Sequence, residues 1–124
     1  MVKTHGPKVS VGHVVLHTGR MDETTQFMLA VGLHSVFQGP DISVLELRGG
    51  THLLLFRAEE PVSAEASFDL MVDDLHSMHD RLAGLGYRPS PIERRPDIGH
   101  ETFDVAEPSG TRITFFSSHA TCES

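Results

Sequence analysis

The chain contains two similar segments, GTHLLLF at residues 50–56 and GTRITFF at residues 110–116, which lie 60 positions apart. The apolar residues before them also align, at smaller shifts, so the second half carries about six extra residues, mostly within 89–99. Extra residues are usually accommodated in surface loops. A repeat of this length predicts two copies of one structural module. The aligned pairs are Leu16 with Leu70 and Met28 with Leu82 at a shift of 54, and Leu45 with Phe103 and Leu47 with Val105 at a shift of 58.

Apolar periodicity predicts the elements of each copy. Helical spacing covers residues 21–31 and 74–85, and a glycine follows each segment. Asp73 or Asp74 is placed to cap the second helix. The order is strand, helix and three strands, twice, so we expect an α+β fold of two tandem βαβββ modules. Alternation predicts strands at 9–18, 33–37, 42–48, 51–57, 66–72, 87–92, 100–106 and 111–117.

The chain length sets the expected domain organisation. A chain of 124 residues fits one domain with a real core. We expect a single domain over residues 1–124, with module one at about 9–57 and module two at about 66–117. The polar stretch 58–65 would link the two modules.

Composition excludes several classes of protein. A net charge of −7 argues against a nucleic-acid-binding protein, because phosphate binding needs clustered positive charge. No run of 18 apolar residues is present, so we expect no membrane partner. The first ten residues lack the apolar core of a signal peptide, and the single cysteine, Cys122, suits a reducing compartment; we therefore expect a cytoplasmic protein. Nine histidines suggest metal binding or acid–base chemistry without choosing between them.

Strand alternation assigns side chains to two faces of each expected sheet. Residues such as Val14, Leu16 and Leu70 should lie against the helices. The opposite face is too apolar for ordinary solvent-exposed surface, so we interpret it as a concave small-molecule binding surface. Its candidate ligand-binding residues are His13, Val15, His17, Glu46, His52, Leu54, Phe56, Ser67, Asp69, Met71, His100, Asp104, Arg112, Thr114 and Phe116.

Three segments resemble a known family. They are GHVVLHTGRMDETTQFM at 12–28, LMVDDLHSMHDRLAGLGY at 70–87 and EPSGTRITFF at 107–116. Together they make residues 9–117 similar to the vicinal oxygen chelate superfamily, the group of glyoxalases, bleomycin resistance proteins and extradiol dioxygenases. The resemblance implies two modules whose mixed sheets curl around a cleft. It also implies a homodimer with the cleft at or near the subunit interface.

The resemblance implies four metal-ligand positions, which in this chain are His13, Leu54, Ser67 and Thr114. Only His13 is a metal-ligand type, whereas a catalytic metal generally needs three protein ligands. We therefore expect no metal site and no cofactor, which disfavours the metal-dependent activities of the family. The alternative is a displaced site for a divalent metal, built from His17, His52, Asp69 and His100 on the same face.

The histidines of this face have two interpretations. His13 and His17 are the candidate catalytic residues, as acid–base groups, and otherwise are strand residues that form ordinary hydrogen bonds. His52 has the same two interpretations. The remaining histidines should be solvated: His5, His34, His76, His79 and His119.

The charged and apolar residues of this face also have more than one interpretation. Glu46 and Asp104 are related by the repeat, so they would form a carboxylate pair across the cleft, or else two solvated strand carboxylates. Arg112 would hold an anionic or carbonyl group of a ligand, or pair with Glu46 or Asp104. The apolar candidates would pack against an apolar ligand or form a dimer seam: Val15, Leu54, Phe56, Met71 and Phe116.

Three functional hypotheses follow. The first is a metal-free small-molecule-binding protein of the bleomycin-resistance type. The second is a lyase or isomerase, similar to lactoylglutathione lyase or a dioxygenase, that uses a displaced metal site or a histidine base. The third is an interaction domain that only dimerises.

Overall fold

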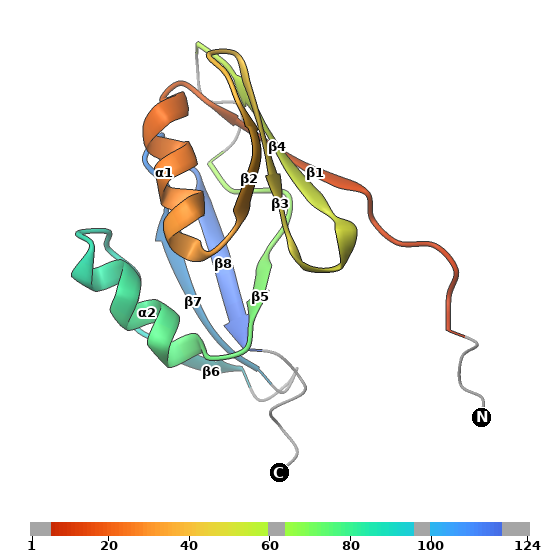
Figure 1. Cartoon of the computed structure of the whole chain (residues 1–124). Coiled ribbons are helices and arrows are strands. Elements are labelled where there is room, and N and C mark those ends of the chain that lie inside the picture. Colours follow the sequence, from red (N-terminus) through yellow and green to blue (C-terminus); the bar gives the residue numbers. More distant parts are fainter. Residues whose placement is uncertain (1–5, 60–63, 96–99, 118–124) are drawn as a thin grey trace.

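A computed structural model of the chain describes residues 6–59, 64–95 and 100–117 (Figure 1). It contains two four-stranded mixed sheets and two α-helices, in the order βαβββ twice, as the repeat predicts. The first sheet has the strand order β1-β4-β3-β2 and the second sheet has the order β5-β8-β7-β6. The elements are β1 (His13–Thr18), α1 (Met21–Val31), β2 (His34–Gln38), β3 (Ile42–Glu46), a 3₁₀ turn (Arg48–Gly50), β4 (His52–Arg57), β5 (Leu70–Val72), α2 (Leu75–Gly84), β6 (Glu93–Arg95), β7 (His100–Ala106) and β8 (Arg112–Ser117).

Both helices end as the sequence predicts. Gly32 has φ 123° and its amide donates to the carbonyls of Met28 and Leu29, which closes the last turn of α1. Gly86 has φ 96° and follows α2 in the same way. Of the two candidate caps of α2, Asp74 is the one used, because its carboxylate accepts the Ser77 amide at 3.0 Å. Among the described residues, no helix is long and apolar enough to cross a membrane.

Four predicted strands differ from the structure by two residues or more, and one of them, predicted at 42–48, ends at Glu46. The strand predicted at 9–18 begins at His13, and the strand predicted at 66–72 begins at Leu70. The prediction of a strand at 87–92 is wrong, since the corresponding strand, β6, spans Glu93–Arg95. Pro89 and Pro91 explain the shift, because proline has no amide hydrogen to donate to a sheet.

The register of the ladders corrects one part of the repeat alignment. In the first sheet Leu45 lies opposite Leu53, whereas in the second sheet Val105 lies opposite Ile113. Leu45 therefore corresponds to Val105 and not to Phe103, so the shift in this strand is 60 rather than 58. A two-residue error leaves every side chain on its predicted face, because the period of a strand is two. It does change which residues are equivalent.

One core joins the two modules. The helix-facing residues of both sheets belong to a single cluster of buried apolar side chains that includes Phe27, Leu55 and Phe115. The Phe103 and Phe115 rings are stacked 5.0 Å apart at 7°, and Tyr87 meets Phe27 edge-on at 4.9 Å. The helices α1 and α2 lie side by side over this core (Figure 1).

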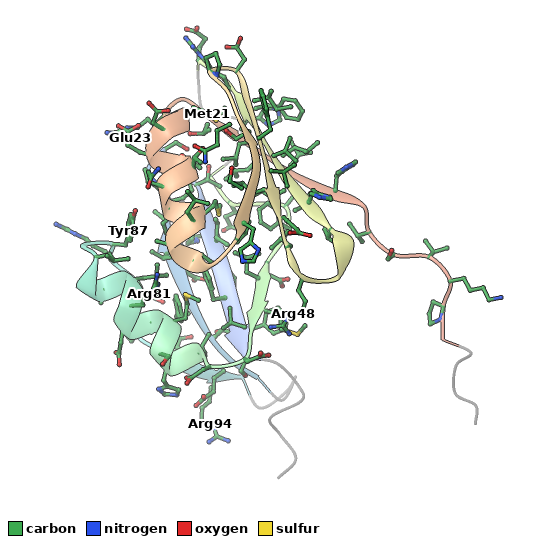
Figure 2. The ribbon with its side chains drawn as sticks, viewed as in Figure 1. Met21, Glu23, Arg48, Arg81, Tyr87 and Arg94 are labelled. Atoms are coloured by element: carbon green, nitrogen blue, oxygen red, sulfur yellow. The ribbon has the colours of Figure 1, made fainter. Side chains whose placement is uncertain are left out.

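Polar contacts also connect the modules. The carboxylate of Glu107, 1% exposed, accepts the Thr24 hydroxyl of α1 at 2.6 Å and the Thr111 amide at 2.9 Å. It also accepts both the amide and the hydroxyl of Ser109. Near the other end of α1, Arg81 of α2 points toward α1 (Figure 2) and donates to the Ala30 carbonyl at 2.6 Å. Neither Glu107 nor Arg81 belongs to an apolar pattern of the sequence.

Candidate functional site

A pair of histidines lies on the open face of the first sheet, the face turned away from α1. His13 of β1 and His52 of β4 are register partners in the parallel ladder. Their ring centroids are 6.1 Å apart and the ring planes are tilted by 48°. Within the part of the chain that the structure describes, neither ring makes a hydrogen bond or an ion pair.

This pair belongs to a polar row that crosses the whole sheet. Glu46 of β3 is the register partner of His52 on one side and of His34 on the other. The Glu46 carboxylate is turned to His34, with His34 Nδ1 at 3.9 Å from Glu46 Oε1. The row therefore runs His34, Glu46, His52, His13 across β2, β3, β4 and β1.

Apolar side chains fill the rest of this open face. Val44, Leu54 and Val15 are consecutive register partners, two residues along the strands from the polar row. Two residues further, the His17 and Phe56 rings lie 5.9 Å apart at 32°. Leu54 and Phe56 are half-buried and Val15 is 36% exposed, so the band is accessible to a ligand.

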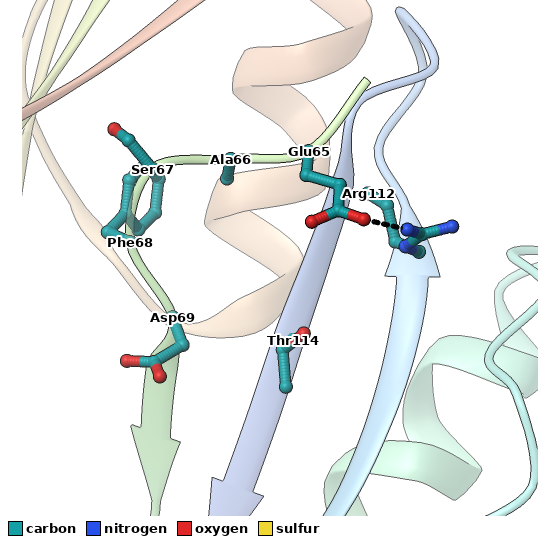
Figure 3. Close-up of a pocket in the computed structure, with 7 residues that line it drawn as sticks. All are labelled: Glu65, Ala66, Ser67, Phe68, Asp69, Arg112 and Thr114. Carbon is teal, nitrogen blue, oxygen red and sulfur yellow. Dashed lines mark hydrogen bonds and ion pairs between the residues drawn. The ribbon is translucent and has the colours of Figure 1, made fainter. Parts of the chain in front are cut away.

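The open face of the second sheet carries a cavity of about 410 Å³ (Figure 3). The Glu65 carboxylate at its rim accepts a hydrogen bond from the Arg112 guanidinium. The prediction that Arg112 pairs with Glu46 or Asp104 is therefore wrong. Arg112 and Glu65 are brought together by a bridge between their backbones, which strand alternation alone does not reveal. The lining residues are Glu65, Ala66, Ser67, Phe68, Asp69, Arg112 and Thr114.

Beside this cavity, the Thr114 hydroxyl donates to the Asp104 carboxylate at 2.6 Å. Asp104 and Glu46 do not correspond by the repeat, because Asp104 lies opposite Thr114 whereas Glu46 lies opposite His52. The predicted symmetric carboxylate pair is therefore wrong: Val44 is the counterpart of Asp104. Met71 is 53% exposed and Phe116 is half-buried on the same sheet. His100 begins β7, and its side chain lies outside the described residues.

The four metal positions that the resemblance implies offer a poor donor set in this chain. Leu54 has no lone pair, and Ser67 and Thr114 offer only neutral hydroxyls, which leaves His13 as the one strong donor. The residues present therefore do not fit the metal that the fold family implies. Among the described residues, no group of three or more His, Cys, Asp or Glu side chains is arranged to hold a metal ion. The displaced site is not assembled among the described side chains either: His17 and His52 lie on the first sheet, whereas Asp69 comes just before β5 of the second sheet.

The remaining described histidines divide into two kinds. His34 and His76 are exposed, as predicted, and His76 Nε2 lies 3.1 Å from Glu101 Oε1. The prediction that His79 is solvated is wrong, since its side chain is 24% exposed. Its Nε2 lies 2.9 Å from the Ser90 carbonyl oxygen and its ring meets Phe103 edge-on, which fixes the segment after α2. His5 and His119 lie outside the described residues.

A second, larger groove of about 1250 Å³ lies between the two modules, and β1, β3, β5 and both helices contribute residues to its lining. Its apolar lining comes from both modules and includes Val14, Phe68 and Met78. At its rim Arg48 makes a bidentate ion pair with Asp73, with Nη2–Oδ2 and Nη1–Oδ1 distances of 3.0 and 3.4 Å. Strand periodicity could not reveal this groove, because it depends on how the modules pack.

Comparison with known proteins agrees with this architecture. The family model of the Glyoxalase/Bleomycin resistance protein/Dioxygenase superfamily matches residues 10–115. No curated protein matches the sequence.

Several solved structures share the fold. A lactoylglutathione lyase from Agrobacterium tumefaciens has a TM-score of 0.76 at 19% identity, covering 94% of this chain and 98% of that one. The bleomycin resistance determinant encoded on transposon Tn5 has a TM-score of 0.70 at 19% identity, covering 90% and 99%. The bleomycin-binding protein of Streptomyces verticillus, solved with copper(II)-bleomycin, has a TM-score of 0.71 at 20% identity, covering 92% and 100%. With the family model spanning both modules, the chain belongs to the glyoxalase/bleomycin resistance protein/dioxygenase superfamily.

Proposed function

We propose that this protein binds a small molecule on the open faces of its sheets, as a member of the bleomycin-resistance type that works without the family's metal. The observation that carries the proposal is the donor set at the four family positions, where only His13 is a metal-ligand type. Related proteins solved with bleomycin support the idea that this fold can serve binding alone. The apolar band on the first sheet suits an aromatic or amphipathic ligand.

We propose further that two copies form a homodimer through the groove between the modules. Val14, Leu47 and Phe68 pack against the core, yet they also line this open groove. The groove also lies beside β1 and β5, each of which is an edge strand with one unpaired side. A second copy would cover both features, because exposed strand edges and large apolar patches favour association. Sedimentation should then show a dimer in the parent protein and a monomer after Phe68→Lys.

A thermal-shift screen of a small-molecule library tests the binding function. A specific ligand present at 100 times its Kd should stabilise the folded protein by about 2.7 kcal/mol. A hit should lose its effect in the Leu54→Asp or Thr114→Arg variant, which would place the ligand on an open face. If no compound stabilises the protein, the chain acts as an interaction domain and the binding proposal fails.

The His13–His52 pair, which has no hydrogen-bond partner among the described residues, favours a second candidate, a lyase or isomerase that moves a proton with a histidine base. Two adjacent imidazoles can accept a proton and return it. Incubating the protein with methylglyoxal and glutathione, and measuring lactoylglutathione, tests the reaction of the lyase relative. Turnover that falls in His13→Ala or His52→Ala, or in His17→Ala on the same face, would support the enzyme, and the absence of turnover in the parent protein would remove this reaction.

A further inference from the structure

The open face of the first sheet combines two features that a ligand could use together. One is the His13–His52 pair, whose ring nitrogens have no hydrogen-bond partner within the described ranges. The other is the apolar band that begins one row away and continues to Phe56. A strand rises by about 3.3 Å per residue, so the four residues from the polar row to the His17–Phe56 pair span about 13 Å.

The hydrogen-bonding capacity of the pair limits which polar group it can hold. A neutral imidazole has one N–H donor and one acceptor nitrogen, so two facing imidazoles offer a donor and an acceptor side by side. A hydroxyl group matches both, because it donates one hydrogen bond and accepts others. A carboxylate only accepts hydrogen bonds, and an ammonium group only donates them.

The negative charge of Glu46, next to the pair, also favours a neutral ligand group. Glu46 is the register neighbour of His52, and its carboxylate is half-exposed. It would repel an anionic group placed at His52. His34 lies 3.9 Å from Glu46 on the side away from His52. His34 is far from His13, because β3 and β4 lie between their strands. A neutral polar group therefore suits this position better than an acid.

The size and shape of the apolar band indicate the rest of the ligand. Val15, Leu54 and Val44 form a continuous row of side chains, and a flat aromatic ring can bury a large apolar area on such a surface. The Phe56 ring lies at the far end, tilted by only 32° from His17. The band is long enough for two fused rings.

We propose that the open face of the first sheet binds a hydroxylated aromatic molecule of about two fused rings. Its hydroxyl lies between His13 and His52, and its rings lie on Val15, Leu54 and Phe56. This assignment rests on the small-molecule-binding function proposed above, and it specifies the class of ligand.

Titration of the full chain with three matched probes tests the assignment. The probes are 2-naphthol, its methyl ether, which keeps the oxygen but cannot donate, and naphthoate, which carries a carboxylate. We expect naphthol to bind about fivefold more tightly than the ether, since one neutral hydrogen bond contributes about 1 kcal/mol. Naphthoate should bind more weakly than naphthol.

Two variants and one control locate the effect. His13→Phe and His52→Phe keep a ring but remove its nitrogens, so each should abolish the preference for naphthol over the ether. His34→Phe lies in the same row but outside the pair, so it should preserve the preference. Circular dichroism of each variant checks that the fold is retained.

Several outcomes would overturn the assignment. It fails if naphthol and the ether bind equally, if naphthoate binds most tightly, or if both variants keep the preference. It also fails if no probe binds; stabilising compounds in the library screen would then leave the binding function standing, whereas an empty screen would remove both.

Discussion

The two modules share one backbone plan, but their open faces carry different chemistry. The first sheet presents imidazoles beside an apolar band, with His13 and His52 as neighbours. The second sheet presents carboxylates and hydroxyls around a cavity, with Arg112 bound to Glu65. The repeated apolar pattern thus preserves the fold, while the positions on the two open faces carry different residues.

The modules also differ away from their open faces, at the two equivalent turns that precede β4 and β8. The Leu47 amide donates to Thr51 at 2.8 Å, and the Glu107 amide donates to Thr111 at 2.9 Å. Gly50 and Gly110 adopt positive φ in these turns. Module one has a half-buried leucine where module two has a buried carboxylate that contacts α1. At this turn only the second module therefore contributes a polar contact to the other module.

The largest predicted effect concerns the aromatic stack of the second module. Phe103 corresponds to Ser43 of the first sheet by ladder register, and both are buried. Phe103→Ala should lower the free energy of unfolding by about 4 kcal/mol, because it leaves a cavity beside Phe115. Urea denaturation measures this change. Ser43→Ala should cost less than about 1.5 kcal/mol, and equal costs would contradict the difference between the two sheets.

The second prediction exchanges the residues of the two turns. Glu107→Leu places module one's residue in module two and leaves the buried Thr24 hydroxyl and two backbone amides without their acceptor. We expect a loss of about 3 kcal/mol in unfolding free energy. Thermal denaturation checks this, with Leu47→Ala as the control, which should cost less because Leu47 is only half-buried. If Glu107→Leu left the free energy of unfolding unchanged, the contact between the modules would not be stabilising.

The third prediction concerns the helix pair. Arg81 of α2 corresponds to Phe27 of α1 in the repeat, and it donates to a carbonyl in the last turn of α1, where α1 has no basic residue of its own. Arg81→Met keeps the alkyl stem and should cost about 0.5 kcal/mol, since the side chain is exposed. The loss should appear as faster amide exchange at the end of α1. Unchanged exchange there would show that α1 does not need this contact.

The smallest effect distinguishes the starts of the two helices. Asp74 caps α2, whereas α1 has no side-chain cap at Arg20. In α1 a hydrogen bond with its own backbone amide, followed by the Arg20 side chain, lowers the pKa of the exposed Glu23 carboxyl. A lowered pKa stabilises the fold above the carboxyl's ordinary pKa, and this contribution is lost as the pH falls through the lowered value.

Glu23→Gln should therefore reduce the melting temperature slightly at neutral pH and leave it unchanged in strong acid. Measuring the melting temperature of both proteins across this pH range checks the prediction. A difference between them that stayed constant with pH would contradict the ionic origin of the effect.

The sequence predicts the fold well because burial is strong and periodic. Leu16, Leu53 and Ile113 face the helices as alternation requires, and both helices begin and end within a residue or two of their predicted limits. The two-residue error that paired Glu46 with Asp104 is invisible to such reasoning, because it preserves the faces. Only the hydrogen-bonded ladder defines which residues correspond.

The candidate site is harder to predict, because it depends on contacts between distant elements. The His13–His52 pair requires β1 and β4 to be parallel neighbours, and the Arg112–Glu65 ion pair requires residue 65 to pass beside β8. Glu107 carries no periodic signal, since it is a charged residue buried in a turn. A charged residue just before a serine–glycine turn could have been noted as a candidate, since buried charges need hydrogen-bond partners.

Metal content tests the central claim of this account, that the fold has kept its binding faces but not its metal. The protein should be purified without chelators from cells grown with added nickel, zinc, iron and manganese, and its metals measured by elemental analysis. With one strong donor among the four family positions, we expect well under one equivalent of any metal per chain, unchanged by His13→Gln. One equivalent of a single metal, lost in His13→Gln, would contradict the account.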